Sequence, residues 1–152
     1  MKRLHKFLSL PTVEKTLLLE AVLLVILVKL SLIILPFKMI QGLINYIGQA
    51  LSMSKSKSKS CNNTISPEQI SWAVAVASRY LLSTKNCLPQ ALAGHILLTQ
   101  YGHPAKVSFG IYRGNEIKFE AHAWIESKGK IVIGKDGIEN YTPLFTNLKE
   151  RA

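Results

Sequence analysis

The longest apolar run in the chain lies near its N-terminus. Residues 16–37 read TLLLEAVLLVILVKLSLIILPF, in which the charged residues are Glu20 and Lys29. A transmembrane helix needs ~20 mostly apolar residues, and a lysine near its centre costs ~2.5–3.5 kcal/mol. The pattern therefore favours a helix buried in the core or docked on a partner protein, with a membrane contact as the alternative. Pro11 suits the first turn and Pro36 the end of this helix, and no small-residue site for a signal peptidase follows it.

A stretch rich in serine and lysine separates this region from the rest of the chain. Residues 52–60 read SMSKSKSKS, and a run of this composition cannot form a core. We therefore predict three parts: an N-terminal helical region over residues 1–51, a linker over 52–64 and a mixed domain over 65–152.

Two helices are predicted at the start of the mixed domain. Ser66 and Gln69 have the spacing of a capping box, which starts a helix over residues 66–82. An asparagine N-cap starts the second helix, over 86–100. Cys87 then lies at a helix N-terminus, where the helix dipole and the unpaired backbone N–H groups stabilise a thiolate and an oxyanion.

The last third of the chain changes to short alternating strands. Residues 105–112, 117–126 and 130–134 have the pattern of strands, with a tight hairpin at 127–129. Consecutive strands joined by short turns predict an antiparallel meander beside the preceding helix. The fold class expected from this order of elements is α+β.

Composition and charge narrow the class of protein. The chain has 152 residues, of which 48% are hydrophobic and 18% charged, which excludes a disordered protein. Its net charge is +10, and the first 60 residues hold nine bases and two acids. This asymmetry suits a membrane surface or an anionic partner better than nucleic acid. The two cysteines, Cys61 and Cys87, form no Cys-x-x-Cys motif, so we expect a protein of the reducing cytoplasm. Membrane association through the apolar helix is the alternative.

A histidine and nearby acids follow Cys87 in the order that a thiol acyl-transfer enzyme needs. A three-residue hairpin loop would place Asp136 diagonally from His122 on one sheet face, whereas a two-residue loop would put it on the wrong face of a regular sheet. Glu120, two residues before His122, is the alternative acid. The predicted catalytic residues are Cys87, His122 and Asp136, with no cofactor and no metal. A metal site that also uses His95 is remote, because His95 lies ~12 Å along the helix from Cys87.

Five segments carry a family resemblance: Asn86–Ala93, Ala121–Glu126, Tyr141–Leu144, Phe7–Pro11 and Leu35–Phe37. They resemble the leader peptidases of lasso-peptide gene clusters, and the resemblance covers nearly the whole chain apart from the Ser/Lys linker. It implies a transglutaminase-like fold, related to papain, in which a cysteine at a helix N-terminus packs on an antiparallel sheet.

The resemblance also implies a reaction and its partners. Cys87 would attack the bond between leader and core of a ribosomally made precursor, and His122 would move the proton. A thioester would form and be hydrolysed by water. The partners implied are the precursor peptide, a separate leader-recognition protein and the ATP-dependent cyclase of this antibiotic biosynthesis. The family's acid often lies where this chain has Gly134, two residues before Asp136.

Two other functions stay open at this point. An acyltransferase or transglutaminase would form the same thioester and pass the acyl group to an amine. A non-catalytic, membrane-associated scaffold would dock the precursor or the cyclase through the apolar helix. A silent Cys87→Ala change would indicate the scaffold.

Overall fold

The computed structural model describes residues 11–34, 65–81, 87–112 and 120–145 of the chain. It is an α+β protein with an apolar N-terminal helix, as the order of elements predicted. The helices are α2 (Thr12–Ile34), α4 (Pro67–Leu81) and α5 (Cys87–Gln100). The strands are β1 (Lys106–Tyr112), β2 (Glu120–Ser127), β3 (Lys130–Ile133) and β4 (Tyr141–Phe145), with a short 3₁₀ helix, η1 (Ile138–Asn140), before β4. The division into parts at 1–51, 52–64 and 65–152 stays a prediction, because residues 35–64 lie outside the described ranges.

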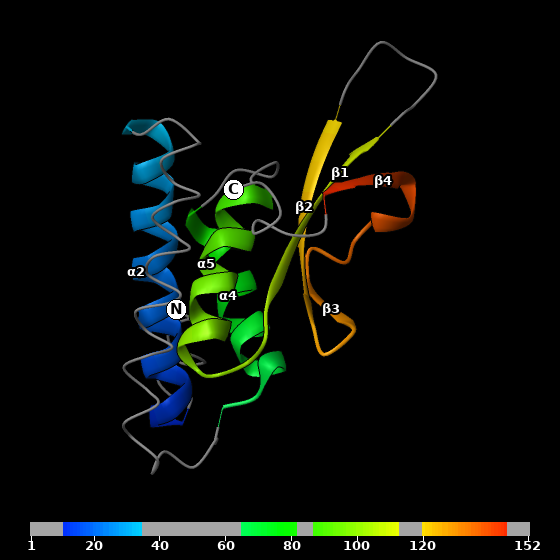
Figure 1. Ribbon diagram of the computed structural model, residues 1–152. Coiled ribbons are helices and arrows are strands. Elements are labelled where there is room, and N and C mark those ends of the chain that lie inside the picture. The colour runs from blue at the N-terminus through cyan, green and yellow to red at the C-terminus, as the bar shows by residue number, and fades with distance from the viewer. Residues whose placement is uncertain (1–10, 35–64, 82–86, 113–119, 146–152) are drawn as a thin grey trace.

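The strands form one antiparallel sheet in the order β3-β2-β1-β4. The three helices lie on one side of it (Figure 1), with α5 and α4 against the sheet and α2 packed on both of them. The meander of β1, β2 and β3 is confirmed. Strand β4 was not predicted, since Pro143 interrupts its pattern. Proline is tolerated there because β4 is an edge strand.

The start of α4 follows the predicted capping box. The backbone N–H of Ser66 donates to Oε1 of Gln69 at 2.9 Å, and the backbone N–H of Gln69 donates to Oγ of Ser66 at 3.3 Å. Two N–H groups that a helix start leaves without partners are thus satisfied. The helix therefore begins at Pro67 and carries its buried face into the core.

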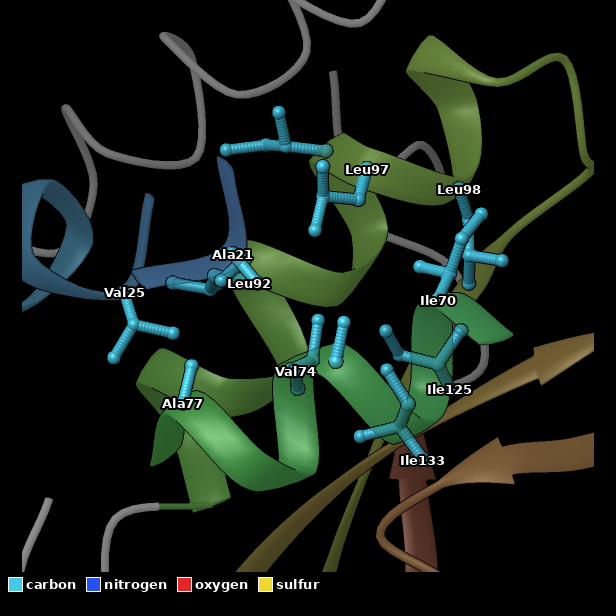
Figure 2. Packing of buried hydrophobic residues seen from close by; sticks show 14 of the residues in the cluster. Ala21, Val25, Ile70, Val74, Ala77, Leu92, Leu97, Leu98, Ile125 and Ile133 are labelled. Carbon is cyan, nitrogen blue, oxygen red and sulfur yellow. The ribbon is translucent and has the colours of Figure 1, made fainter. Parts of the chain in front are cut away.

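Helix α2 belongs to the same core as the rest of the protein. Five of its side chains are buried in the cluster that α4, α5 and the sheet share (Figure 2). Both charged residues that interrupt its apolar run make tertiary contacts: Glu20 accepts a hydrogen bond from the Tyr101 hydroxyl at 2.8 Å, and Lys29 donates from Nζ to the Leu81 carbonyl at 3.1 Å. These contacts support the prediction of a core helix.

The outer face of α2 is nevertheless apolar and exposed. By length and composition this helix is also able to cross a membrane, and it lies near the N-terminus, as a signal sequence does. Its exposed large side chains are Val13, Leu19, Leu23, Ile26, Leu27, Leu30, Ile33 and Ile34.

The prediction of a three-residue loop in the β2–β3 hairpin is wrong. Ser127 pairs with Lys130, so the loop has two residues, Lys128 and Gly129, and both have positive φ. Such a pair forms the tight turn that matches the twist of a hairpin. The register then shifts between Ile125 and Glu126, as in a β-bulge. The consequence is that the sheet beside His122 is not regular, and the face of Asp136 cannot be read from the loop length.

Candidate active site

Cys87 is the first residue of α5, as predicted, and its side chain is half-buried. Its Sγ atom donates to the carbonyl oxygen of Ala121, 3.8 Å away. Ala121 directly precedes His122 on β2. The fold therefore brings the thiol to the strand that carries the predicted base, across 34 residues of sequence.

The position of Cys87 gives it electrostatic support. It lies at the positive end of the helix dipole, and the first turn of a helix has N–H groups without intrahelical partners. Pro89 is buried in this first turn and removes one such donor. The N–H groups of Cys87 and Leu88 are the donors that this helix start can offer to an oxyanion.

His122 lies on β2 beside two aromatic rings. Its ring centroid is 5.0 Å from that of Tyr141 and 6.3 Å from that of Trp124. Gly110 faces it across the β1–β2 ladder, and a Cβ at Gly110 would come within 3.0 Å of both Trp124 and Tyr141. Because Gly110 has no side chain, Tyr141 of β4 can lie close to the imidazole of His122.

The imidazole is held by a backbone group. Nε2 of His122 lies 2.9 Å from the carbonyl oxygen of Gly134. A carbonyl can only accept a hydrogen bond, so Nε2 is the donor, and in the neutral imidazole Nδ1 then has the lone pair that a general base needs. Gly134 follows the last residue of β3 and has a φ of 76°.

The carboxylates near His122 make other contacts or face solvent. The Asp136 side chain is exposed, and within the described ranges no hydrogen bond or ion pair joins it to His122. Glu126 accepts a hydrogen bond from Nε1 of Trp124 at 3.1 Å. Glu120 is half-buried at the start of β2. The structure thus brings Cys87 and the strand of His122 together, while the catalytic role of Asp136 stays a prediction.

Sequence reasoning missed two groups at this site. Tyr141 lies beside His122, and its only signal was its place in a segment quoted for resemblance. The Gly134 carbonyl is the second group: the sequence marks position 134 only as the place where the family often has its acid, and every residue has a carbonyl. His95, half-buried in α5, lies elsewhere in the fold, and burial lowers the pKa of its imidazole. Among the described residues, no three His, Cys, Asp or Glu side chains are grouped as metal ligands would be.

Comparison with known proteins agrees with this geometry. The model of the transglutaminase-like superfamily matches residues 31–146, which include α4, α5 and the whole sheet. No curated protein and no solved structure matches the chain. A match over most of the chain, with a cysteine at a helix N-terminus beside a histidine strand, places this protein in the transglutaminase-like superfamily.

Proposed function

We propose that this protein is a cysteine peptidase that removes the leader from a lasso-peptide precursor. The observation that carries the proposal is the contact of the Cys87 thiol with the residue that precedes His122. Membership of the transglutaminase-like superfamily is compatible with peptidase or acyltransferase chemistry. The finer assignment to leader removal rests on the lasso-peptidase resemblance of segments such as Asn86–Ala93 and Ala121–Glu126.

The proposed reaction uses the groups described at the site. Nδ1 of His122 takes the thiol proton as Sγ of Cys87 bonds to the carbonyl carbon of the last leader residue. The resulting oxyanion receives hydrogen bonds from the N–H groups at the start of α5. Each such donor stabilises the transition state by ~3–4 kcal/mol. The bond to the core nitrogen then breaks, and His122 returns its proton to that nitrogen.

Water completes the turnover. His122 removes a proton from water as its oxygen bonds to the thioester carbon, and the C–S bond breaks. The products are the leader with a free carboxylate, the core with a free amine, and the restored thiol. We infer that a separate recognition protein delivers the leader and that an ATP-dependent cyclase uses the freed amine. The site of action that fits these partners is the cytoplasm.

One experiment tests this function against the alternatives. The precursor, its leader-recognition protein and this chain are incubated together, and the peptide masses are recorded. The peptidase predicts one cut at the leader–core junction whose two products together exceed the precursor by the mass of one water. Cys87→Ala should remove this cut, whereas Cys61→Ala, which changes the other cysteine, should retain it.

The same experiment contains the results that would contradict the proposal. A leader found joined to an added amine, with no free leader, would identify an acyltransferase. An unchanged precursor with wild-type protein, with folding and precursor binding confirmed, would favour a non-catalytic scaffold.

A further inference from the structure

We propose that the Gly134 carbonyl, rather than a carboxylate, is the group that orients His122. This inference rests on the proposed function, because it assigns the third member of the same site. Its basis is the 2.9 Å contact between Nε2 of His122 and the Gly134 oxygen. The carbonyl fixes the proton on Nε2 and leaves Nδ1 to act on the Cys87 thiol, as an orienting carboxylate does in a catalytic triad.

The backbone conformation at position 134, which places the carbonyl beside His122, requires a glycine. Its φ of 76° lies in the left-handed region, which glycine adopts without steric cost. A Cβ at this position would lie 2.7 Å from the Ala123 carbonyl oxygen and 3.1 Å from the Trp124 backbone. No other residue therefore fits without moving the chain. The turn out of β3 places the carbonyl at His122 because position 134 is glycine.

Asp136 does not replace this contact in the structure. Asp136 is exposed two residues further on, and among the described residues it makes no hydrogen bond with the imidazole. Glu120 also shares the face of His122 on β2. Both acids are included in the test below.

A neutral partner has a chemical consequence. A carboxylate orients the imidazole and also stabilises the imidazolium by its charge, and losing it costs ~10⁴-fold in kcat in a serine protease. A carbonyl orients the ring without a net charge. The reactivity of Cys87 should then depend on His122 and on the backbone at Gly134, but not on the charge of Asp136 or Glu120.

The test compares four variants by thiol alkylation, which needs no substrate. Iodoacetamide labelling of Cys87 is measured between pH 5 and 9 by peptide mapping, with Cys61 in the same chain as the reference thiol. The variants are Asp136→Asn, Glu120→Gln, Gly134→Ala and Gly137→Ala. Gly137 is the matched control: its φ is 72°, but a Cβ there meets no atom within 4 Å.

We expect Asp136→Asn and Glu120→Gln to keep the pH profile of Cys87 labelling within ~2-fold of wild type. Gly134→Ala should slow labelling by ~10-fold or more near neutral pH, on the scale that a general base contributes, while Gly137→Ala should not. A second measurement follows the Nε2 proton of His122 by NMR, assigned by its loss in His122→Gln. It should exchange slowly in wild type and in Asp136→Asn, and rapidly in Gly134→Ala.

Three results would overturn the proposal. These are a ~10-fold or larger loss in Asp136→Asn or Glu120→Gln, equal labelling in the two glycine variants, or no protected Nε2 proton in wild type. If Gly134→Ala fails to fold, the acid variants and the wild-type proton still decide. Because neither readout uses the precursor, a failure of the peptidase assay leaves this test intact.

Discussion

Helices α2 and α5 are both apolar on nearly every side, yet the fold uses them differently. Helix α5 buries eight of its 14 residues between the other helices and the sheet. Helix α2 buries five of its 23 residues and leaves a broad apolar face exposed. Gly94 lets α5 approach the sheet closely, because Ile133 and Ile125 of the sheet occupy the space in which a side chain at position 94 would lie. An all-round apolar pattern therefore indicates that a helix is buried on at least one side, but it does not give the extent of that burial.

The difference also separates two roles. Helix α5 carries Cys87 at its N-terminus, so its tight packing fixes the Cys87 thiol relative to β2. Helix α2 is held to the rest of the fold by hydrogen bonds of two of its charged residues: Glu20 accepts one from Tyr101, just after α5, and Lys29 donates one to Leu81 of α4. The predictions below test this contrast, from the largest expected effect to the smallest.

The largest effect should come from removing a core side chain of α5. Leu97 is fully buried, so Leu97→Ala should lower the free energy of unfolding by ~2–5 kcal/mol. The matched change on α2 is Leu23→Ala, since Leu23 is 59% exposed, and it should cost less than ~0.5 kcal/mol. Urea unfolding of both variants measures the difference. Equal losses would show that the outer face of α2 is covered by another surface.

A smaller effect is expected where α5 meets the sheet. A Cβ at Gly94 would lie 2.2 Å from Cδ1 of Ile133, so Gly94→Ala should destabilise the protein by ~1–3 kcal/mol despite the better helix propensity of alanine. Ile133→Val removes the clashing Cδ1 atom. The double variant should therefore recover part of the loss in a double-mutant cycle. Strictly additive losses would mean that this contact does not set the helix–sheet distance.

The anchor of α2 on α4 should contribute less. Lys29→Met keeps the apolar stem and removes the hydrogen bond to the Leu81 carbonyl, which should cost ~0.5–1.5 kcal/mol. Arg79→Met, an exposed basic residue in the last turn of α4, is the control and should stay within ~0.5 kcal/mol. Thermal unfolding measures both. If Lys29→Met is as stable as the control, the hydrogen bond from Lys29 to Leu81 does not stabilise the fold.

The smallest effect is a pH dependence that belongs to α5. Burial lowers the pKa of His95 in the folded state below its ordinary value of 6.5. The unfolded chain then binds a proton that the folded chain does not, so stability is full above pH 6.5 and falls as pH drops through the folded pKa. One group contributes at most ~1.4 kcal/mol per pH unit. In urea unfolding at several pH values, His95→Gln should flatten the dependence of the free energy of unfolding on pH. An unchanged dependence would show that another group causes it.

The sequence predicted the parts of this fold that depend on local pattern. The capping box at Ser66, the helix that starts at Cys87 and the three strands of the meander all follow from residue types at fixed spacing. Strand β4 did not, because Pro143 is compatible with a strand only at a sheet edge.

In the candidate site, the sequence singled out Cys87 and His122 but not the Tyr141 ring beside them. The bulge between Ile125 and Glu126 changes the register after the hairpin, and no residue type announces it. The partner of His122 is a backbone carbonyl, a group that every residue has and that no residue type reveals. The features that the sequence did not predict are therefore tertiary contacts and strand register.

The central claim is that Cys87 forms a thioester with the leader, and intact-protein mass spectrometry tests it most directly. The precursor, its recognition protein and this chain are mixed and quenched with acid at early times. We expect wild type to gain the mass of the leader minus one water, on the peptide that contains Cys87, and to lose this mass in hydroxylamine. Release of the core without any adduct, or an unchanged rate of release with Cys87→Ala, would contradict the account.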